Sequence, residues 1–360
     1  MSDGSFKTRL PCGRRWTVNP RISIFYGALE NDSPPSPLSY CFEGGISLPY
    51  TDRSFLYMID HVLCACDFSP SSERALGYAL ELVERTGASL HLMHVQEISL
   101  GPFVQGDPSP APGDEALQRQ FEERCREEMA DFSFTPDNDR LRFVAARSGA
   151  VAPALVQYVE KHDVDLVVMG TQGRRGVGRA LFGSVAEEVL RSAPCPVLTT
   201  RALNGDGSGP PRPDPIDQVV APVDFSEPSR GALRYAARLA STYEVPLTLV
   251  HALHVPKLPP AYGVEFSAAS WQDLEERVQS ALESWKEEVV PEAKPGTCVV
   301  KRGEPVASIL DAASTPGDLL VMATRGLSGV KRTMLGSVAE GVLRQAKGPV
   351  LSGRSFPTVS

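Results

Sequence analysis

The chain has 360 residues, of which 42% are hydrophobic and 22% charged, so it is long enough for two globular domains with cores of their own. Its formal net charge of -8 argues against a nucleic-acid partner, because such binding rests on basic groups that neutralise phosphates. No apolar run reaches the roughly 20 residues of a membrane-spanning helix, and the first residues lack the apolar segment of a secretory signal, so we expect neither a membrane nor a secreted protein.

The seven cysteines follow no disulfide, redox or zinc spacing. We therefore expect buried free thiols and a reducing, cytoplasmic location.

Residues 1–57 differ from the rest of the chain. They carry six prolines and polar clusters such as the run from Asn31 to Pro37, with only short apolar patches. Such a composition cannot bury enough surface to offset the entropy of ordering, so we expect a mostly disordered extension. Met58 precedes the first regular segment, and an alternative is that translation starts there and the extension is rarely made.

Residues 58–201 predict an alternation of strands and helices. The first strand ends at Asp67, and the helix after it buries Leu76, Leu80 and Val83 at helical spacing before it stops at Gly87. Further strands are expected over 89–95, 141–146, 165–169 and 197–200, and further helices over 114–130, up to about 162, and over 184–192.

Residues 202–215 are rich in glycine, serine and proline, which predicts a linker. The whole pattern then returns over 216–353. Five alternations of strand and helix in each repeat predict an α/β protein with two tandem, Rossmann-like, doubly wound parallel sheets of five strands. In such sheets ligands bind beyond the carboxyl ends of the strands.

A glycine-rich loop follows the fourth strand of each repeat. The segments Gly170–Leu198 and Ala323–Leu351 align without gaps and are identical at 17 of 29 positions. A strand, a glycine-rich loop and a helix start in that order form a phosphate cradle, because glycine lets the backbone approach a ligand and free helix N–H groups favour an anion.

These residues resemble the universal stress protein family in its tandem, two-domain form. The family motif G-x2-G-x9-G-S/T is filled by Gly170, Gly173, Gly183 and Ser184, and in the second repeat by Gly326, Gly336 and Ser337 with Ala323 replacing the first glycine. An aspartate ends the first strand twice, as Asp67 and Asp224.

The resemblance implies an adenine-nucleotide alpha-hydrolase-like fold that binds ATP, together with Mg2+, or another adenine nucleotide. It places each aspartate near the ribose and each glycine loop around the phosphates. It also implies that Val95 and Ala252 pack beside the adenine. Because Ala323 adds a methyl group, we expect the second crevice to bind more weakly.

Each site residue also has a purely structural interpretation. The glycine loops could be plain connectors, Asp67 and Asp224 could form turns, and Ser184 with Glu187, like Ser337 with Glu340, fits a capping box. The basic residues of the loops, from Arg174 to Arg179 and from Arg325 to Arg332, either neutralise phosphate or lie in solvent. The pairs His91/His94 and His251/His254 do not predict a metal site, because residues three apart on a strand point to opposite faces.

The function we expect is that of a nucleotide-binding regulator or sensor in the stress response, with a regulatory protein as partner. Two alternatives stay open: a slow ATPase or nucleotide-processing enzyme, and an interaction module without nucleotide. No Walker lysine and no repeated nucleophile–base pair supports a dedicated enzyme. We also expect Val197–Thr200 and Val350–Ser352 to pair within the chain as a pseudo-dimer, with further homodimerisation as an option.

Overall fold

The computed structural model describes residues 40–41, 47–48, 59–98, 115–171, 182–201, 213–254, 268–291, 296–326 and 335–357. The chain divides into two compact units, Met1–Arg53 and Ser54–Ser360. In the described part of the first unit, β1 (Tyr40–Cys41) pairs antiparallel with β2 (Ser47–Leu48). Apart from these two short strands, the extension predicted to be disordered (1–57) lies outside the described residues, and so does most of the predicted linker.

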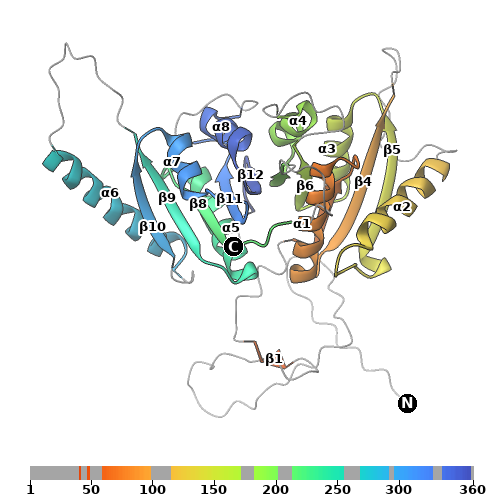
Figure 1. Ribbon diagram of the computed structural model, residues 1–360, viewed down its shortest axis with the longest axis horizontal. Coiled ribbons are helices and arrows are strands. Elements are labelled where there is room, and N and C mark those ends of the chain that lie inside the picture. Colours follow the sequence, from red (N-terminus) through yellow and green to blue (C-terminus); the bar gives the residue numbers. More distant parts are fainter. Residues whose placement is uncertain are drawn as a thin grey trace, which may run out of the picture. The chain divides into compact units, whose positions relative to one another are not determined.

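The second unit consists of two halves with the same order of elements (Figure 1). The first half contains β3 (His61–Ala65), α1 (Pro70–Thr86), β4 (Ser89–Glu97), α2 (Glu115–Met129), a 3-10 turn (Asn138–Arg140), β5 (Leu141–Ser148), α3 (Val151–Lys161), β6 (Leu166–Gly170), α4 (Ser184–Ser192) and β7 (Val197–Thr200). The second half contains β8 (Gln218–Pro222), α5 (Glu227–Tyr243), β9 (Leu247–Leu253), α6 (Ala268–Val289), β10 (Thr297–Arg302), α7 (Pro305–Ala312), β11 (Asp318–Ala323), α8 (Ser337–Gln345) and β12 (Val350–Gly353).

The helix that follows the first strand of each half begins at a serine cap. Ser69 and Ser226 accept a hydrogen bond from the main-chain N–H of Ser72 and Ser229, which satisfies one of the free donors of the first turn. A proline in that turn supports the start, because it needs no N–H partner there. Helix α1 ends at Gly87 in the left-handed region, as its sequence predicts.

The ten strands of the second unit form one continuous sheet in the order β10-β9-β8-β11-β12-β7-β6-β3-β4-β5. All pairs within a half are parallel, whereas β7 and β12 pair antiparallel with Leu198 opposite Leu351. The predicted pairing of these two strands is confirmed, and so is the predicted fold class. The β7–β12 junction covers an edge that each half would otherwise expose.

Each face of the sheet carries its own hydrophobic core. Successive residues alternate between the two cores, so Val62 and Cys64 point to one face and Leu63 to the other. Helices α1, α2, α5 and α6 cover the first face, and α3, α4, α7 and α8 cover the second. Both cores extend through both halves. Their packing holds in place the carboxyl ends of the strands, where the polar side chains of the site lie.

Candidate functional site

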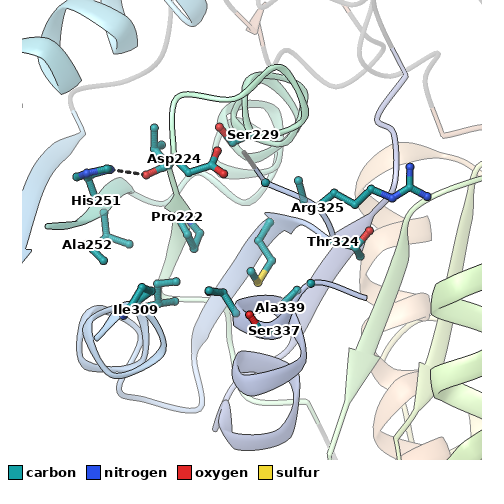
Figure 2. A pocket seen from close by; sticks show the side chains of 18 residues that line it. Pro222, Asp224, Ser229, His251, Ala252, Ile309, Thr324, Arg325, Ser337 and Ala339 are labelled. Carbon is teal, nitrogen blue, oxygen red and sulfur yellow. Dashed lines mark hydrogen bonds between the residues drawn. The ribbon is translucent and has the colours of Figure 1, made fainter. Parts of the chain in front are cut away.

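A pocket of about 220 Å³ lies at the carboxyl ends of β8, β9 and β11 in the second half (Figure 2). The first residues of α7 and α8 close its other side. Five of the predicted site residues line it together: Asp224, Ala252, Gly326, Gly336 and Ser337. Ala323, the replacement for the first motif glycine, lines it as well. Residues far apart in sequence thus meet where a doubly wound sheet binds its ligands.

Asp224 holds the turn between β8 and α5 and also faces this pocket. Its Oδ1 accepts hydrogen bonds from the main-chain N–H of Ser226 at 3.0 Å and from the Ser226 hydroxyl at 2.5 Å. Between them Phe225 takes a φ of 62°, a left-handed conformation that is strained for a bulky residue. Asp224 therefore does form the turn. The same hydrogen bonds hold its carboxylate at the pocket, so forming the turn does not prevent it from binding a ligand.

Gly326 packs directly against this carboxylate. A Cβ atom placed on Gly326 would come within 2.2 Å of Asp224 Oδ2. Real side chains essentially never approach so closely, so any larger residue at the second motif glycine would displace the Asp224 carboxylate. The sequence motif and the upstream aspartate are two parts of one arrangement.

A histidine anchors the same turn from the neighbouring strand. The Nδ1 atom of His251 lies 2.7 Å from the carbonyl oxygen of Val223 (Figure 2). The ring centroids of His251 and Phe225 are 5.0 Å apart. Because a carbonyl only accepts, Nδ1 is the donor. His94 makes the same 2.7 Å contact with Cys66 O in the first half. The sequence did not predict that these two histidines hold the aspartate turns, because the contact joins neighbouring strands.

The glycine before α8 bonds the residue that follows β11. Gly336 N donates to Thr324 O at 2.9 Å, and Gly183 N donates to Thr171 O at 2.8 Å in the first half. A Cβ on Gly183 would lie 2.8 Å from that carbonyl oxygen. This close approach requires glycine at the third motif position of the first half.

The capping-box interpretation of Ser184 and Ser337 is wrong. Gly183 and Gly336 occupy the N-cap positions, with no side-chain cap, and each serine is the first helical residue. The main-chain N–H groups of Glu187 and Glu340 bond to the glycine carbonyls. The exposed serine hydroxyls therefore stand at an uncapped helix start, where N–H groups and the helix dipole favour an anion.

The first half repeats this geometry with Asp67, whose Oδ1 accepts from Ser69 N at 3.0 Å and Ser69 Oγ at 2.6 Å. Phe68 is again left-handed, with a φ of 60°. Val95, the predicted adenine contact, lies on β4 and is buried against the second core. Gly173 and the predicted basic residues of the loop, except Arg325, lie outside the described residues.

Gly170, the first motif glycine, is explained by helix packing. A Cβ at this position would meet Ser71 Oγ at 2.5 Å and the Ser71 main-chain carbon at 2.8 Å, and Gly170 is not in the positive-φ region. In the second half Ala323 fits, and its methyl group packs against the core on the α5 face. Ala323 also lines the pocket, so the weaker binding expected for the second half stays a prediction.

The two halves differ beside the aspartate turn. In the first half Arg124 lies over the Phe68 ring at 4.1 Å and 3.6 Å from Glu128. Burial and, after it, the nearby charge of Glu73 raise the pKa of Glu128 to about 7, while Arg124 opposes the shift. In the second half Trp285 takes this place and contacts Phe225 at 5.6 Å. The sequence did not predict this cluster, because Glu73 on α1 and Glu128 on α2 come together only in the tertiary fold.

Within the described ranges no group of three or more His, Cys, Asp or Glu side chains is placed to hold a metal ion. None of the helices described is long and apolar enough to cross a membrane.

The fold and site define a tandem α/β chain that has a pocket at the strand ends of its second half and the same aspartate turn in its first half. The family model "Universal stress protein family" matches residues 58–201 and again 215–352. The chain belongs to the universal stress protein family.

Relatives support this assignment. Universal stress protein Rv2623 of Mycobacterium tuberculosis is 29% identical over 310 residues, which cover 82% of this chain and 97% of the relative. A universal stress protein of Thermus aquaticus is 34% identical over 146 residues, covering 40% of this chain and all of the relative. Universal stress protein Rv2005c of Mycobacterium tuberculosis is 31% identical over 205 residues, which span 56% of this chain and only 65% of that relative.

Solved structures share the fold. A functionally unknown protein, PA1789 from Pseudomonas aeruginosa, superimposes with a TM-score of 0.57 at 16% identity, over 84% of this chain and 95% of that one. A universal stress protein from Archaeoglobus fulgidus gives a TM-score of 0.53 at 19% identity, over 82% and 99%.

Proposed function

We propose that this protein is a cytoplasmic regulator or sensor of the stress response that binds an adenine nucleotide, ATP, in the crevice of each half. The observation that carries the proposal is the meeting of Asp224, Gly326 and the uncapped start of α8 in one pocket. A carboxylate, a close-approach glycine and free helix N–H groups are the groups that a ribose and a phosphate chain need.

Each wall of the pocket would recognise a different part of the nucleotide. Asp224 would accept hydrogen bonds from ribose hydroxyls, since its carboxylate is already oriented by the Ser226 turn. The N–H groups and hydroxyl at Ser337 would bind phosphate oxygens. Ala252 and Ile309 form an apolar surface suited to the adenine ring. Mg2+ would enter with the phosphates, whose charge it neutralises.

The same arrangement around Asp67, Gly183 and Ser184 supports a second binding site in the first half. The aspartate turns agree in their hydrogen bonds and in the strained phenylalanine. We propose that both crevices are occupied, and that nucleotide state controls a regulatory protein partner.

Calorimetric titration with ATP tests the proposal. Gly326→Val should remove one binding site, because the new side chain meets the Asp224 carboxylate, and Gly173→Val should remove the other. Gly149→Val is the matched control: a Cβ there meets nothing within 4 Å, so binding should match the wild type. Absence of ATP binding by the wild-type protein would overturn the proposal and favour the interaction module. Phosphate release above that of the double variant would indicate the slow ATPase.

A further inference from the structure

The two candidate phosphate sites are connected by hydrogen bonds that cross the β7–β12 junction. The connection begins at the threonine that follows the fourth strand of each half, Thr171 after β6 and Thr324 after β11. The carbonyl oxygen of each threonine accepts the main-chain N–H of the glycine at the helix start, Gly183 or Gly336. Thr324 also lines the pocket, so a nucleotide bound there would lie against it.

From Thr324 the hydrogen bonds lead to α4 in the first half. Its main-chain N–H and its hydroxyl both donate to the carbonyl oxygen of Gly353, at 2.9 Å and 3.3 Å. The next residue, Arg354, donates from Nη2 to the carbonyl oxygens of the last residue of α4 and of its C-cap, at 3.0 Å and 3.1 Å. The amino end of this nine-residue helix, at Ser184, is the candidate phosphate site of the first half.

The corresponding residues of the first half lead to α8. Thr171 N donates to Thr200 O at 2.8 Å. The next residue, Arg201, donates to the carbonyl oxygen of Arg344 in the last turn of α8. The Thr171 hydroxyl is buried and has no hydrogen-bond partner among the described residues, so this connection lacks the second bond that Thr324 makes. The route through Arg354 is therefore the more firmly held of the two.

The two arginines are the elements that can respond to a ligand. Both are partly exposed, so each side chain can lie on the helix end, as it does here, or turn into solvent. A helix favours negative charge at its amino end and positive charge at its carboxyl end. A nucleotide that fixes Thr324 also fixes Gly353, and this favours the position of Arg354 on α4. The helix is then capped before the first-half nucleotide binds at its amino end.

We propose that Arg354 and Arg201 couple the two nucleotide sites, so that ATP bound in one crevice raises the affinity of the other. This rests on the proposed function, because it needs a nucleotide in each crevice. Coupling between two sites typically changes affinity about 5- to 150-fold, and hydrogen bonds from partly exposed side chains place this protein at about 5-fold. Because coupling of binding is reciprocal, the factor is the same whichever site fills first.

A thermodynamic cycle measured by calorimetric titration with ATP tests the coupling. Gly326→Val and Gly173→Val each leave one site and give its binding constant with the other site empty. In the wild-type protein the product of the two binding constants should exceed the product of the two single-site constants about 5-fold. The cycle is then repeated with Arg354→Ala, with Arg201→Ala and with both. Arg354→Ala should lower the ratio more than Arg201→Ala, and the double substitution should bring it to one.

Arg191→Ala is the matched control. Arg191 also lies on α4, but its exposed pair with Glu187 is 3.9 Å long and stays within that helix. The ratio should therefore match that of the wild type. Circular dichroism shows whether each variant is folded.

The possible outcomes separate the coupling from the proposed function. A ratio of one or less in a wild-type protein that binds two ATP molecules would overturn the coupling and leave the proposed function standing. A ratio that stays at its wild-type value without both arginines would overturn their role. Binding of a single ATP molecule also contradicts the coupling, whereas a wild-type protein that binds no ATP contradicts the proposed function itself.

Discussion

Arg354, which follows the last strand of the second half, donates a hydrogen bond to the carbonyl oxygen of Ser192 at the end of α4 in the first half, at 3.0 Å. A second bond, to Ala193 O, is 3.1 Å long. The arrangement is reciprocal, because Arg201 after β7 donates to Arg344 O at the end of α8. In each half an arginine thus caps the carboxyl end of a helix of the other half, α4 or α8. The amino ends of the same two helices are the candidate phosphate sites.

Removing this contact should weaken the joined structure. Arg354→Ala loses two charge-assisted hydrogen bonds at a negative helix end, so the free energy of unfolding should fall by about 1–2 kcal/mol. Urea unfolding followed by circular dichroism measures the change. Arg191→Ala is the control: its exposed pair with Glu187 is 3.9 Å long, and its loss should cost less than about 0.5 kcal/mol. Equal effects of the two substitutions would contradict the structural role of Arg354.

Gly170 should be intolerant of even one methyl group. Gly170→Ala forces a Cβ against Ser71, and such overpacking should cost about 1–3 kcal/mol in thermal or urea unfolding. Gly149→Ala, in open space, should stay within about 0.5 kcal/mol of the wild type. A Gly170→Ala protein of normal stability with impaired ATP binding would instead indicate that this glycine serves the ligand.

Gln118 should protect the free edge of the sheet at β5. Its side-chain N–H donates to Phe143 O and its side-chain oxygen accepts from Ala145 N, both at 2.8 Å. The side chain thus makes the main-chain hydrogen bonds that a neighbouring strand would otherwise make. Gln118→Leu should lower the free energy of unfolding by about 1–3 kcal/mol, because both main-chain groups lose their partner.

The same variant should also associate at high concentration, which light scattering detects. Gln272→Leu makes the same change at an exposed residue of α6 that bonds only Glu276 among the described residues. It should leave both stability and association nearly unchanged. Association of both variants alike would point to surface hydrophobicity instead of the sheet edge.

Acid should destabilise the protein through His91, which lies near the start of β4 and is 7% exposed. Burial and, after it, the charges of His61, Arg142 and His162 together lower the pKa of His91 to about 4. Tyr158 OH lies 3.2 Å from its Nδ1. An unfolded histidine takes up its proton near pH 6.5, so the unfolded state binds more protons below that pH and stability falls from there toward pH 4.

His91→Thr, which carries the residue found at Thr248 in the second half, should flatten this dependence. Its urea midpoint should be lower than that of the wild type at about pH 7.5 and should fall less as the pH drops to about 4.5. Parallel pH profiles of the two proteins would exclude His91 as the source.

The sequence was sufficient to predict the architecture, but it predicted the candidate site only in part. Strand and helix periodicity, doubled in one chain, predicted the tandem sheets, and the resemblance to the universal stress protein family predicted the β7–β12 pair. The capping-box pattern gave a wrong prediction at Ser184, because Gly183 occupies the N-cap and Ser184 is the first helical residue. The packing reason for Gly170 and the cluster around Glu128 depend on contacts between elements that no spacing reveals.

The antiparallel β7–β12 junction has a consequence for how the halves can diverge. A dimer of identical chains must repeat every residue on both sides of its twofold axis, so a buried cysteine or a buried histidine would occur twice or not at all. Here the connection keeps the halves together at a high effective concentration, while each side varies independently. Cys66 and His91 in the first half correspond to Val223 and Thr248 in the second, a difference that joining two domains in one chain permits.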